Sequence, residues 1–212
     1  MIELPGGVIE ERFGIQLGEV TDPDLLDITV LGNGSTLLNG ALHLVGKRIT
    51  VSDLVLDGRR PTGQVLALYS SGAVTLDHVA VVNLAEPDTG GGSRKPRGAS
   101  LYSIGPATTL TVRDSLFLDN KHSVDIGGFD TGMGFASARF ERVRFAGSAA
   151  PEVDLGRIDR LEFLDSTRLG GTGAFAATTV RTVVLSEPTE RPADESTLAA
   201  CRAELERWGT AR

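Results

Sequence analysis

A ten-residue string recurs five times in this sequence of 212 residues, and the repeat constrains the fold more than any other feature. The copies start at Ile49, Val74, Leu110, Ala138 and Leu161, which lie 25, 36, 28 and 23 residues apart. A period in the twenties that tolerates insertions is typical of a solenoid. Each coil of a solenoid contacts only its neighbours, so its loops can lengthen without disturbing the stack.

Each copy has the pattern of a short β-strand followed by a tight bend. It begins with two apolar residues that flank a variable one, and this period of two predicts a strand with one buried face. Residue types that tolerate positive φ end the copies: Gly58, Asn83, Asp119, Gly147 and Gly170. A second apolar triplet precedes each copy, at residues 42–44, 66–68, 101–103, 124–126 and 153–155. Each coil is therefore expected to hold two short strands, a bend and a loop, without long helices.

These strands and coil lengths predict an all-β fold, a single-stranded right-handed parallel β-helix of about six to seven coils with a C-terminal helix. Over about residues 25–185 the repeat resembles that of the pectate-lyase-like superfamily. The resemblance lies in the repeat pattern and not in a catalytic motif. The main alternative is an antiparallel β-sandwich, which also has many short strands but has no reason to repeat one string in register.

The ends of such a stack expose apolar core and unpaired strand edges, so each end needs a cap. Residues 1–26 are interpreted as the N-terminal cap, with Ile9, Phe13, Ile15 and Leu17 buried. Residues 27–187 are interpreted as the β-helix, and residues 188–212 as a linker and a C-terminal capping helix.

The expected C-terminal helix begins after Asp194 or Ser196 and carries one apolar face. Four residues share that face at helical spacing: Leu198, Cys201, Leu205 and Trp208. The helix is expected to lie on the last coil or against a partner. Cys201 is interpreted as a core residue, because buried thiols behave as small hydrophobic groups.

Stacking places equivalent residues of successive coils about 4.8 Å apart, so the aligned copies predict columns of side chains. The outward position near the start of each string gives one column: Thr50, Thr75, Thr111, Arg139, Glu162 and Arg181. The fifth position gives a column of alternating charge: Asp53, His78, Asp114, Arg142 and Asp165. Both are interpreted as structural ladders of polar pairs. For the second column an acid–base or metal site is the alternative, but one histidine with two aspartates is incomplete as a zinc site.

The outward residues of the preceding triplets form the candidate catalytic column: His43, Ala67, Tyr102, Asp125 and Asp154. The resemblance implies that such an outward strand face, edged by loops, serves as a substrate groove. Tyr102 is suited to stack on a sugar ring, with Asp125 and Asp154 as a carboxylate pair. Carboxylates about 5 Å apart suit a retaining glycosidase and about 6.5–9.5 Å an inverting one, and adjacent coils predict the shorter separation. Ordinary solvated surface is the alternative interpretation of these aspartates.

Basic residues cluster in the loops that follow the strings, and they are the candidate ligand-binding residues: Arg59, Arg60, Arg94, Lys95, Arg97, Lys121 and His122. Arginine forks suit carboxylates and phosphates. The predicted ligand is therefore anionic: an acidic or sulfated glycan, a phosphorylated molecule or an acidic protein surface. Solvated loop charge, balanced by neighbouring acidic residues, is the alternative.

Composition narrows the protein class. The formal net charge of −7 argues against general nucleic-acid binding, and no apolar run approaches the roughly 18 residues of a membrane span. The N-terminus lacks the pattern of a secretory signal, and the single cysteine fits a reducing compartment. A cytoplasmic protein without cofactor or metal is expected. Aromatic residues make up only 5%, so the core is expected to consist of Val, Leu and Ile.

Three functions remain open at this stage. The first is a non-catalytic binding or scaffold protein, monomeric or homotrimeric, that recognises an anionic ligand or protein partner through the basic loops. The second is a carbohydrate-active enzyme, a glycoside hydrolase or polysaccharide lyase, as the resemblance implies. Lyases of that superfamily typically use a carboxylate-bound calcium, and no Asp-rich cluster lies beside the basic residues here. The third is an oligomeric assembly subunit.

Overall fold

A computed structural model describes residues 1–10, 15–19, 26–58, 66–83, 99–105, 107–120, 124–128, 133–146, 153–169, 176–185, 189–191 and 195–210. The strands are β1 (Ile2–Glu3), β2 (Gly7–Glu10), β3 (Ile15–Leu17), β4 (Asp27–Leu38), β5 (Leu42–Asp57), β6 (Leu66–Val82), β7 (Ala99–Ser103), β8 (Thr108–Arg113), β9 (Leu116–Leu118), β10 (Val124–Gly128), β11 (Phe135–Glu141), β12 (Arg144–Ala146), β13 (Val153–Leu164), β14 (Thr167–Leu169), β15 (Ala176–Leu185) and β16 (Thr189–Arg191). One helix, α1 (Glu195–Thr210), follows them.

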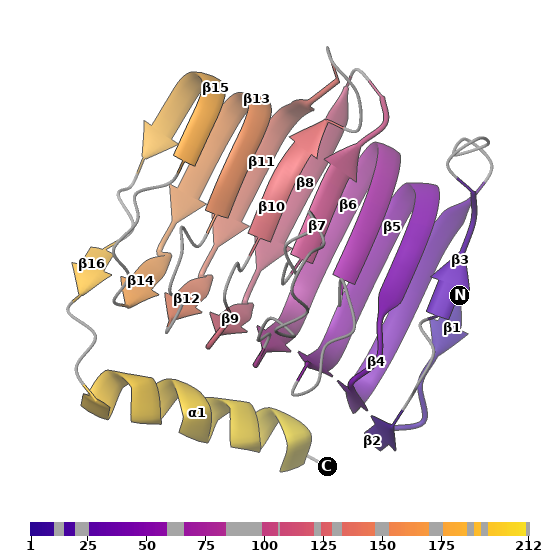
Figure 1. The fold of residues 1–212 in the computed structure, drawn as a ribbon, viewed down its shortest axis with the longest axis vertical. Coiled ribbons are helices and arrows are strands. Elements are labelled where there is room, and N and C mark those ends of the chain that lie inside the picture. Colours follow the sequence, from indigo (N-terminus) through magenta and orange to yellow (C-terminus); the bar gives the residue numbers. More distant parts are fainter. Residues whose placement is uncertain are drawn as a thin grey trace, which may run out of the picture.

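The described strands pair in parallel and wind around one apolar core (Figure 1). The equivalent first residues of the five strings pair in succession, from Ile49 through Val74, Leu110 and Ala138 to Leu161. The predicted all-β parallel solenoid with a C-terminal helix is therefore confirmed, and the antiparallel sandwich is excluded. Parallel pairing follows from the repeat, because each coil lays the same string on its neighbour in the same direction.

The outward surface of the solenoid has three sides, which we call faces A, B and C. Face A comprises β3, β7, β10, residues 42–46 of β5, residues 66–70 of β6 and residues 153–155 of β13. Face B comprises β1, β8, β11 and residues 27–31, 48–52, 73–77, 157–164 and 179–185. Face C comprises β2, β9, β12, β14, β16 and residues 35–38, 54–57 and 79–82. In Figure 1, β7 and β10 of face A lie in front of β8 and β11 of face B, and face C forms the lower edge.

The turn from face B to face C repeats the same backbone conformation in successive coils. The fifth residue of each string has positive φ: Asp53 (51°), His78 (56°), Asp114 (48°), Arg142 (53°) and Asp165 (49°). Asn83 and Asp119, which end two of the strings, have φ of 60° and 55° as predicted, whereas Gly58, which ends another, does not have positive φ. Asn and Asp tolerate this region because their short side chains hydrogen-bond locally. Gly147 and Gly170 lie outside the described residues.

The core differs between the two ends of the stack. Its N-terminal layers consist of Val, Leu and Ile, as composition predicted. The C-terminal layers instead stack phenylalanines: Phe117 on Phe145 at 5.3 Å between ring centroids, and Phe140 on Phe163 at 5.0 Å. Few aromatic residues suffice because the stack brings rings from successive coils into contact, and such pairs contribute about 0.5–1.5 kcal/mol beyond burial.

Helix α1 lies along face C and not over the end of the stack (Figure 1). Its buried Cys201 and half-buried Leu205 pack against an apolar cluster that includes Val82, Leu116 and Ala146, which belong to three different coils. The Arg202 guanidinium also donates to the Asp119 carboxylate at 2.9 Å. The core role of Cys201 is confirmed, while the side chains of Leu198 and Trp208 lie outside those described. The described helix is not long and apolar enough to cross a membrane.

The N-terminal residues form the first layer of the solenoid itself. Strands β1 and β2 pair with β4, and β3 pairs with β5. Ile9, Ile15 and Leu17 pack against the core but are only half-buried, which is less than the sequence predicted. Phe13 lies outside the described residues. The first layer is less buried because a terminal layer has only one neighbouring layer to cover it.

Candidate binding face

Face A carries two outward rows of residues in register. The first row contains Gln16, His43, Ala67, Ser100, Asp125 and Asp154. The second row contains Val45, Tyr69, Tyr102 and Gly127. Asp125 and Asp154 are thus direct neighbours on adjacent strands, as predicted from the repeat.

The predicted position of Tyr102 in the first row is wrong. Ala99, not Leu101, pairs with Leu66, so the triplet on β7 is shifted by two residues from its predicted alignment. Ser100 takes the first-row position, and Tyr102 pairs with Tyr69. Side chains two residues apart share a strand face, so the shift keeps Tyr102 on face A and moves it from the carboxylate row to its neighbour.

Three rings from successive strands form a continuous aromatic series on face A, with His43 from the first row and Tyr69 and Tyr102 from the second. The ring centroids of His43 and Tyr69 are 5.2 Å apart, and those of Tyr69 and Tyr102 are 5.3 Å apart, with the tyrosine rings 29° from parallel. All three side chains are partly exposed. Tyrosine combines a large apolar ring with a polar hydroxyl, which suits a contact surface. This aromatic series runs across the strands, along the axis of the stack.

His43 differs from the two tyrosines of the aromatic series in having a buried polar atom without a partner among the described residues. Its Nε2 atom is buried and has no hydrogen-bond partner in the described part of the chain. Burial lowers the pKa of the His43 imidazole, because the charged form loses hydration that nothing replaces. His43 is therefore a neutral ring at pH 7, suited to packing and hydrogen bonding.

The middle of the first row is buried. Ala67 and Ser100 are buried, with exposed fractions of 4% and 0%. The partly exposed tyrosines of the second row are therefore the more accessible part of the face. A Cβ added to Gly127 would lie 3.7 Å from the ring of Tyr102, so this ring lies beside the backbone of β10.

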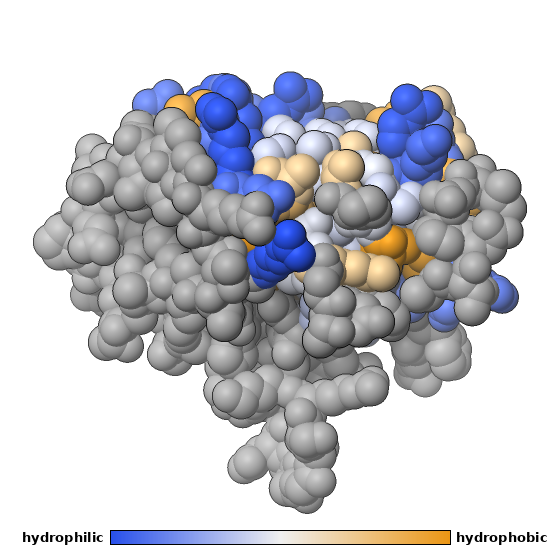
Figure 2. Space-filling view, turned by 90° about the horizontal axis from the view of Figure 1, so that it is seen from above, coloured by the Kyte–Doolittle hydropathy of each residue, from blue (hydrophilic) through white to orange (hydrophobic). Residues whose placement is uncertain are grey.

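The edge between faces A and B holds Tyr102 in place. Figure 2 looks down on this edge and shows surface of intermediate to hydrophobic character between hydrophilic groups. The next residue after Tyr102 is Ser103, whose buried hydroxyl donates to Thr108 Oγ1 at 2.8 Å, and Thr108 donates to the Ser70 carbonyl. A Cβ on Gly105 would lie only 2.6 Å from the Ser71 carbonyl oxygen. The passage from β7 to β8 therefore requires glycine at position 105.

Face B carries the predicted outward column. Thr29, Thr50, Thr75 and Thr111 are in register on adjacent strands, followed by Arg139 and Glu162. Thr29 adds one position to the predicted column. Arg181 is not its last member, because Glu162 pairs with Val184. The last copy of the string is degenerate, and its register differs by three residues from the predicted one. Arg181 therefore lies in a different row.

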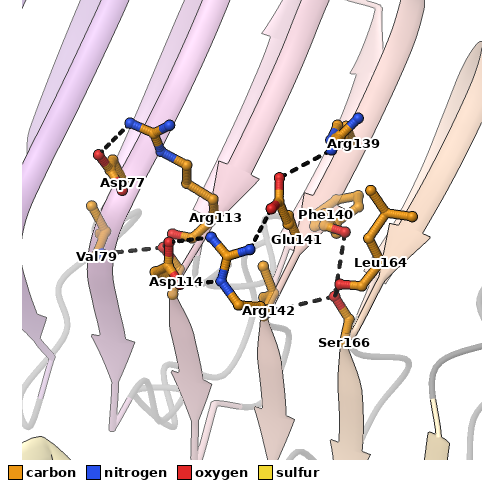
Figure 3. Close-up of polar contacts among 12 residues, drawn as sticks. Asp77, Val79, Arg113, Asp114, Arg139, Phe140, Glu141, Arg142, Leu164 and Ser166 are labelled. Carbon is orange, nitrogen blue, oxygen red and sulfur yellow. Dashed lines mark hydrogen bonds and ion pairs between the residues drawn. The ribbon is translucent and has the colours of Figure 1, made fainter.

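The charged column at the turn from face B to face C also forms as predicted. His78 Nδ1 lies 2.9 Å from Asp53 Oδ1, and the Arg142 guanidinium donates twice to the Asp114 carboxylate at 2.6 and 2.8 Å. Arg142 also pairs with Glu141, and Arg113 pairs with Asp77 at 2.6 Å (Figure 3).

These pairs hold the carboxylates of face B in their ionised form. Hydrogen bonding from Arg142 keeps the pKa of Asp114 below its usual range, and Arg142 and Arg139 do the same for Glu141. Groups held in this way are poor proton donors near neutral pH. Within the described residues no three His, Cys, Asp or Glu side chains gather as a metal site would require. The ladder thus has the geometry of a structural element.

The predicted basic cluster is Arg59, Arg60, Arg94, Lys95, Arg97, Lys121 and His122, and it lies entirely outside the described residues. Its members belong to the chain segments that lead into three strands of face A. Residues 59–65 precede β6, residues 84–98 precede β7, and residues 121–123 precede β10. The side chains of Asp125 and Asp154 are likewise outside those described, and their placement rests on backbone register.

Comparison with known proteins adds no relative. No protein-family model, curated protein or solved structure matches this chain. The candidate face therefore rests on the residues and the geometry given above.

Proposed function

We propose that this protein is a non-catalytic binding protein that holds an acidic saccharide on face A. The observation that carries the proposal is the aromatic series of His43, Tyr69 and Tyr102 across three successive strands. Saccharides present both apolar C–H surface and hydroxyl groups, and partly exposed tyrosines offer a ring and a hydroxyl to each. Binding sites commonly combine aromatic lining with a few placed polar groups.

The acidic character of the ligand follows from the chain order of the basic residues. Arg59 and Arg60 precede the strand that carries Tyr69, and Arg94, Lys95 and Arg97 precede the strand that carries Tyr102. Binding residues commonly sit in connections held by a rigid scaffold. Arginine forks pair well with the carboxylates or sulfates of an acidic sugar.

A glycoside hydrolase is the second candidate, and one observation favours it. Asp125 and Asp154 are register neighbours on β10 and β13. Adjacent strands are about 4.8 Å apart, close to the carboxylate separation of a retaining glycosidase. This function, and membership of the pectate-lyase-like superfamily, would agree with the fold, but fold alone does not determine function. We also propose that the protein is cytoplasmic and is either a monomer or a homotrimer.

The binding proposal is tested with oligomers of a hexuronic acid and matched neutral oligomers, by calorimetry on the whole protein. The acidic oligomers should bind more tightly, and more weakly as salt rises from about 0.05 to 0.5 M. Tyr102→Ala should weaken binding about two- to tenfold, since one aromatic contact contributes about 0.5–1.5 kcal/mol. Thr111→Ala on face B is the matched control and should bind normally. If Tyr102→Ala binds as tightly as Thr111→Ala, face A is not the site.

The same oligomers decide between binding and hydrolysis. Incubation followed by chromatography should return them intact if the protein only binds. If new reducing ends appear and both Asp125→Asn and Asp154→Asn abolish them, the hydrolase replaces the binding protein as the function. The charge reversal Arg94→Glu with Lys95→Glu should weaken only the acidic oligomers, and unchanged affinity would remove the basic segments from the site.

A further inference from the structure

The N-terminal end of the stack, formed by β1, β2 and β3, is a second candidate binding surface of this molecule. We propose that the outer edge of β2, in the layer formed by β1, β2 and β3, is a strand-addition site that takes an extended segment of another protein, with basic residues alternating with apolar ones. This inference is independent of saccharide binding on face A.

The strands of this layer are paired on one side only. Among the described residues β1 and β2 pair with β4, and β3 pairs with β5, while no strand pairs with their outer edges. An open edge presents backbone N–H and C=O groups that another chain can complete. Adding a strand to such an edge is a common way to bind an extended peptide.

Within the described residues, the apolar side chains of this layer are less covered than those of the next layer. Ile2, Ile9, Ile15 and Leu17 pack against the core and are half-buried. Their register partners one layer further in are Val30, Leu37, Leu42 and Leu44, which are 0–2% exposed. The two layers differ mainly in having one neighbour or two. One more layer of apolar side chains would bury the first layer equally.

The exposed large apolar side chains of the described residues lie in or beside the first two layers. The large apolar residues that are exposed in the described chain are Met1 (82%), Val8 (72%) and Leu26 (45%). Met1 and Val8 flank or belong to the first-layer strands, and Leu26 directly precedes β4. Of the three, Val8 lies on β2 and adds exposed apolar surface beside the proposed edge.

The charges of the layer select the partner. Its described residues carry Glu3, Glu10 and Glu19 and no lysine or arginine. A second copy of the same end would bring these carboxylates together, which disfavours a head-to-head dimer. An extended segment along β2, with apolar residues toward the core and lysines or arginines alongside, would instead pair with the open edge, cover Ile9 and lie beside the charge of Glu10.

The test uses the whole protein and a synthetic peptide, acetyl-Lys-Val-Lys-Ile-Lys-Val-amide, in a fluorescence anisotropy titration. The peptide should bind, and Glu10→Lys should weaken it about tenfold because the charge at the edge is reversed. Glu206→Lys on the exposed side of α1 changes the net charge equally and should bind like the unchanged protein. A peptide methylated on all of its backbone nitrogens should not bind, because strand addition needs its amide protons.

Three results would overturn the inference. The first is absence of peptide binding. The second is equal loss in Glu10→Lys and Glu206→Lys, or binding of the methylated peptide, since either would show attraction to the net charge alone. The third is a concentration-dependent dimer, measured by analytical ultracentrifugation, that Glu10→Lys or Val8→Lys dissolves, which would assign the end to a second copy.

Discussion

Faces A and B are outward sides of the same stack of strands, yet they use their side chains differently. On face B and at its turn to face C, arginines pair with carboxylates of neighbouring strands, and threonines fill the column at Thr50; the paired arginines are Arg48, Arg113, Arg139 and Arg142. On face A three rings follow one another and the Nε2 of His43 has no partner among the described residues. The charged side chains of face B thus pair with one another, whereas the rings of face A can still contact a ligand.

The largest expected effect concerns the edge that separates the two faces. Gly105→Ala should lower the free energy of unfolding by about 1–3 kcal/mol, because the new Cβ overlaps the backbone of Ser71. Gly127→Ala on face A is the control, since its Cβ meets Tyr102 at an ordinary 3.7 Å and should cost much less. Urea unfolding of both variants measures this. Equal losses would mean that the edge does not set the spacing of the faces.

An intermediate effect is expected from His43 when the pH falls. Its folded-state pKa is lowered by burial, so below its unfolded pKa of about 6.5 the unfolded chain binds more protons than the folded one. Stability present above that pH should therefore be lost as the pH falls toward the folded pKa. Unfolding of the unchanged protein and of His43→Phe, measured between about pH 7 and 5, should show a flatter pH dependence in the variant. Parallel curves would show that His43 titrates normally.

A smaller effect is expected on face B, where the charged pairs are exposed to solvent. Arg142→Gln should change stability less than Gly105→Ala does, because water screens such pairs. It should raise the pKa of Asp114, whose main hydrogen-bond donor it removes. The lowered pKa of Asp114 adds stability above pH 4 that is lost in acid, so the variant should lose less on acidification. NMR titration of the Asp114 carboxyl tests this, and an unchanged pKa would contradict the pairing.

The smallest effect is expected in the threonine column. Thr75→Val should change stability by no more than about 0.5 kcal/mol, since the residue lies on a partly exposed strand face with β-branched neighbours. It should leave saccharide binding unchanged. A clear loss of binding would move the site from face A to face B. Thermal unfolding and the calorimetric assay described above provide both measurements.

Much of this arrangement was predictable because a solenoid converts sequence alignment directly into contacts. The columns at Thr50 and at Asp53 formed in register, and Asp125 fell beside Asp154. Prediction failed where the string was worn or an insertion intervened. Tyr102 was displaced by two residues after the long insertion before β7, and Val184 replaced Arg181 in the last copy.

The sequence by itself determined the periodic features: strands with one buried side, a bend of positive φ at a fixed position, and stacking of equivalent residues. These follow from local preferences repeated at a regular interval. Only the tertiary structure decided that Tyr69 and Tyr102 meet, that α1 lies along face C, and that the first layer leaves its apolar side chains half-buried. Those outcomes depend on where each connection lets its strand enter the sheet and on which surface remains uncovered, and neither is encoded in a ten-residue pattern.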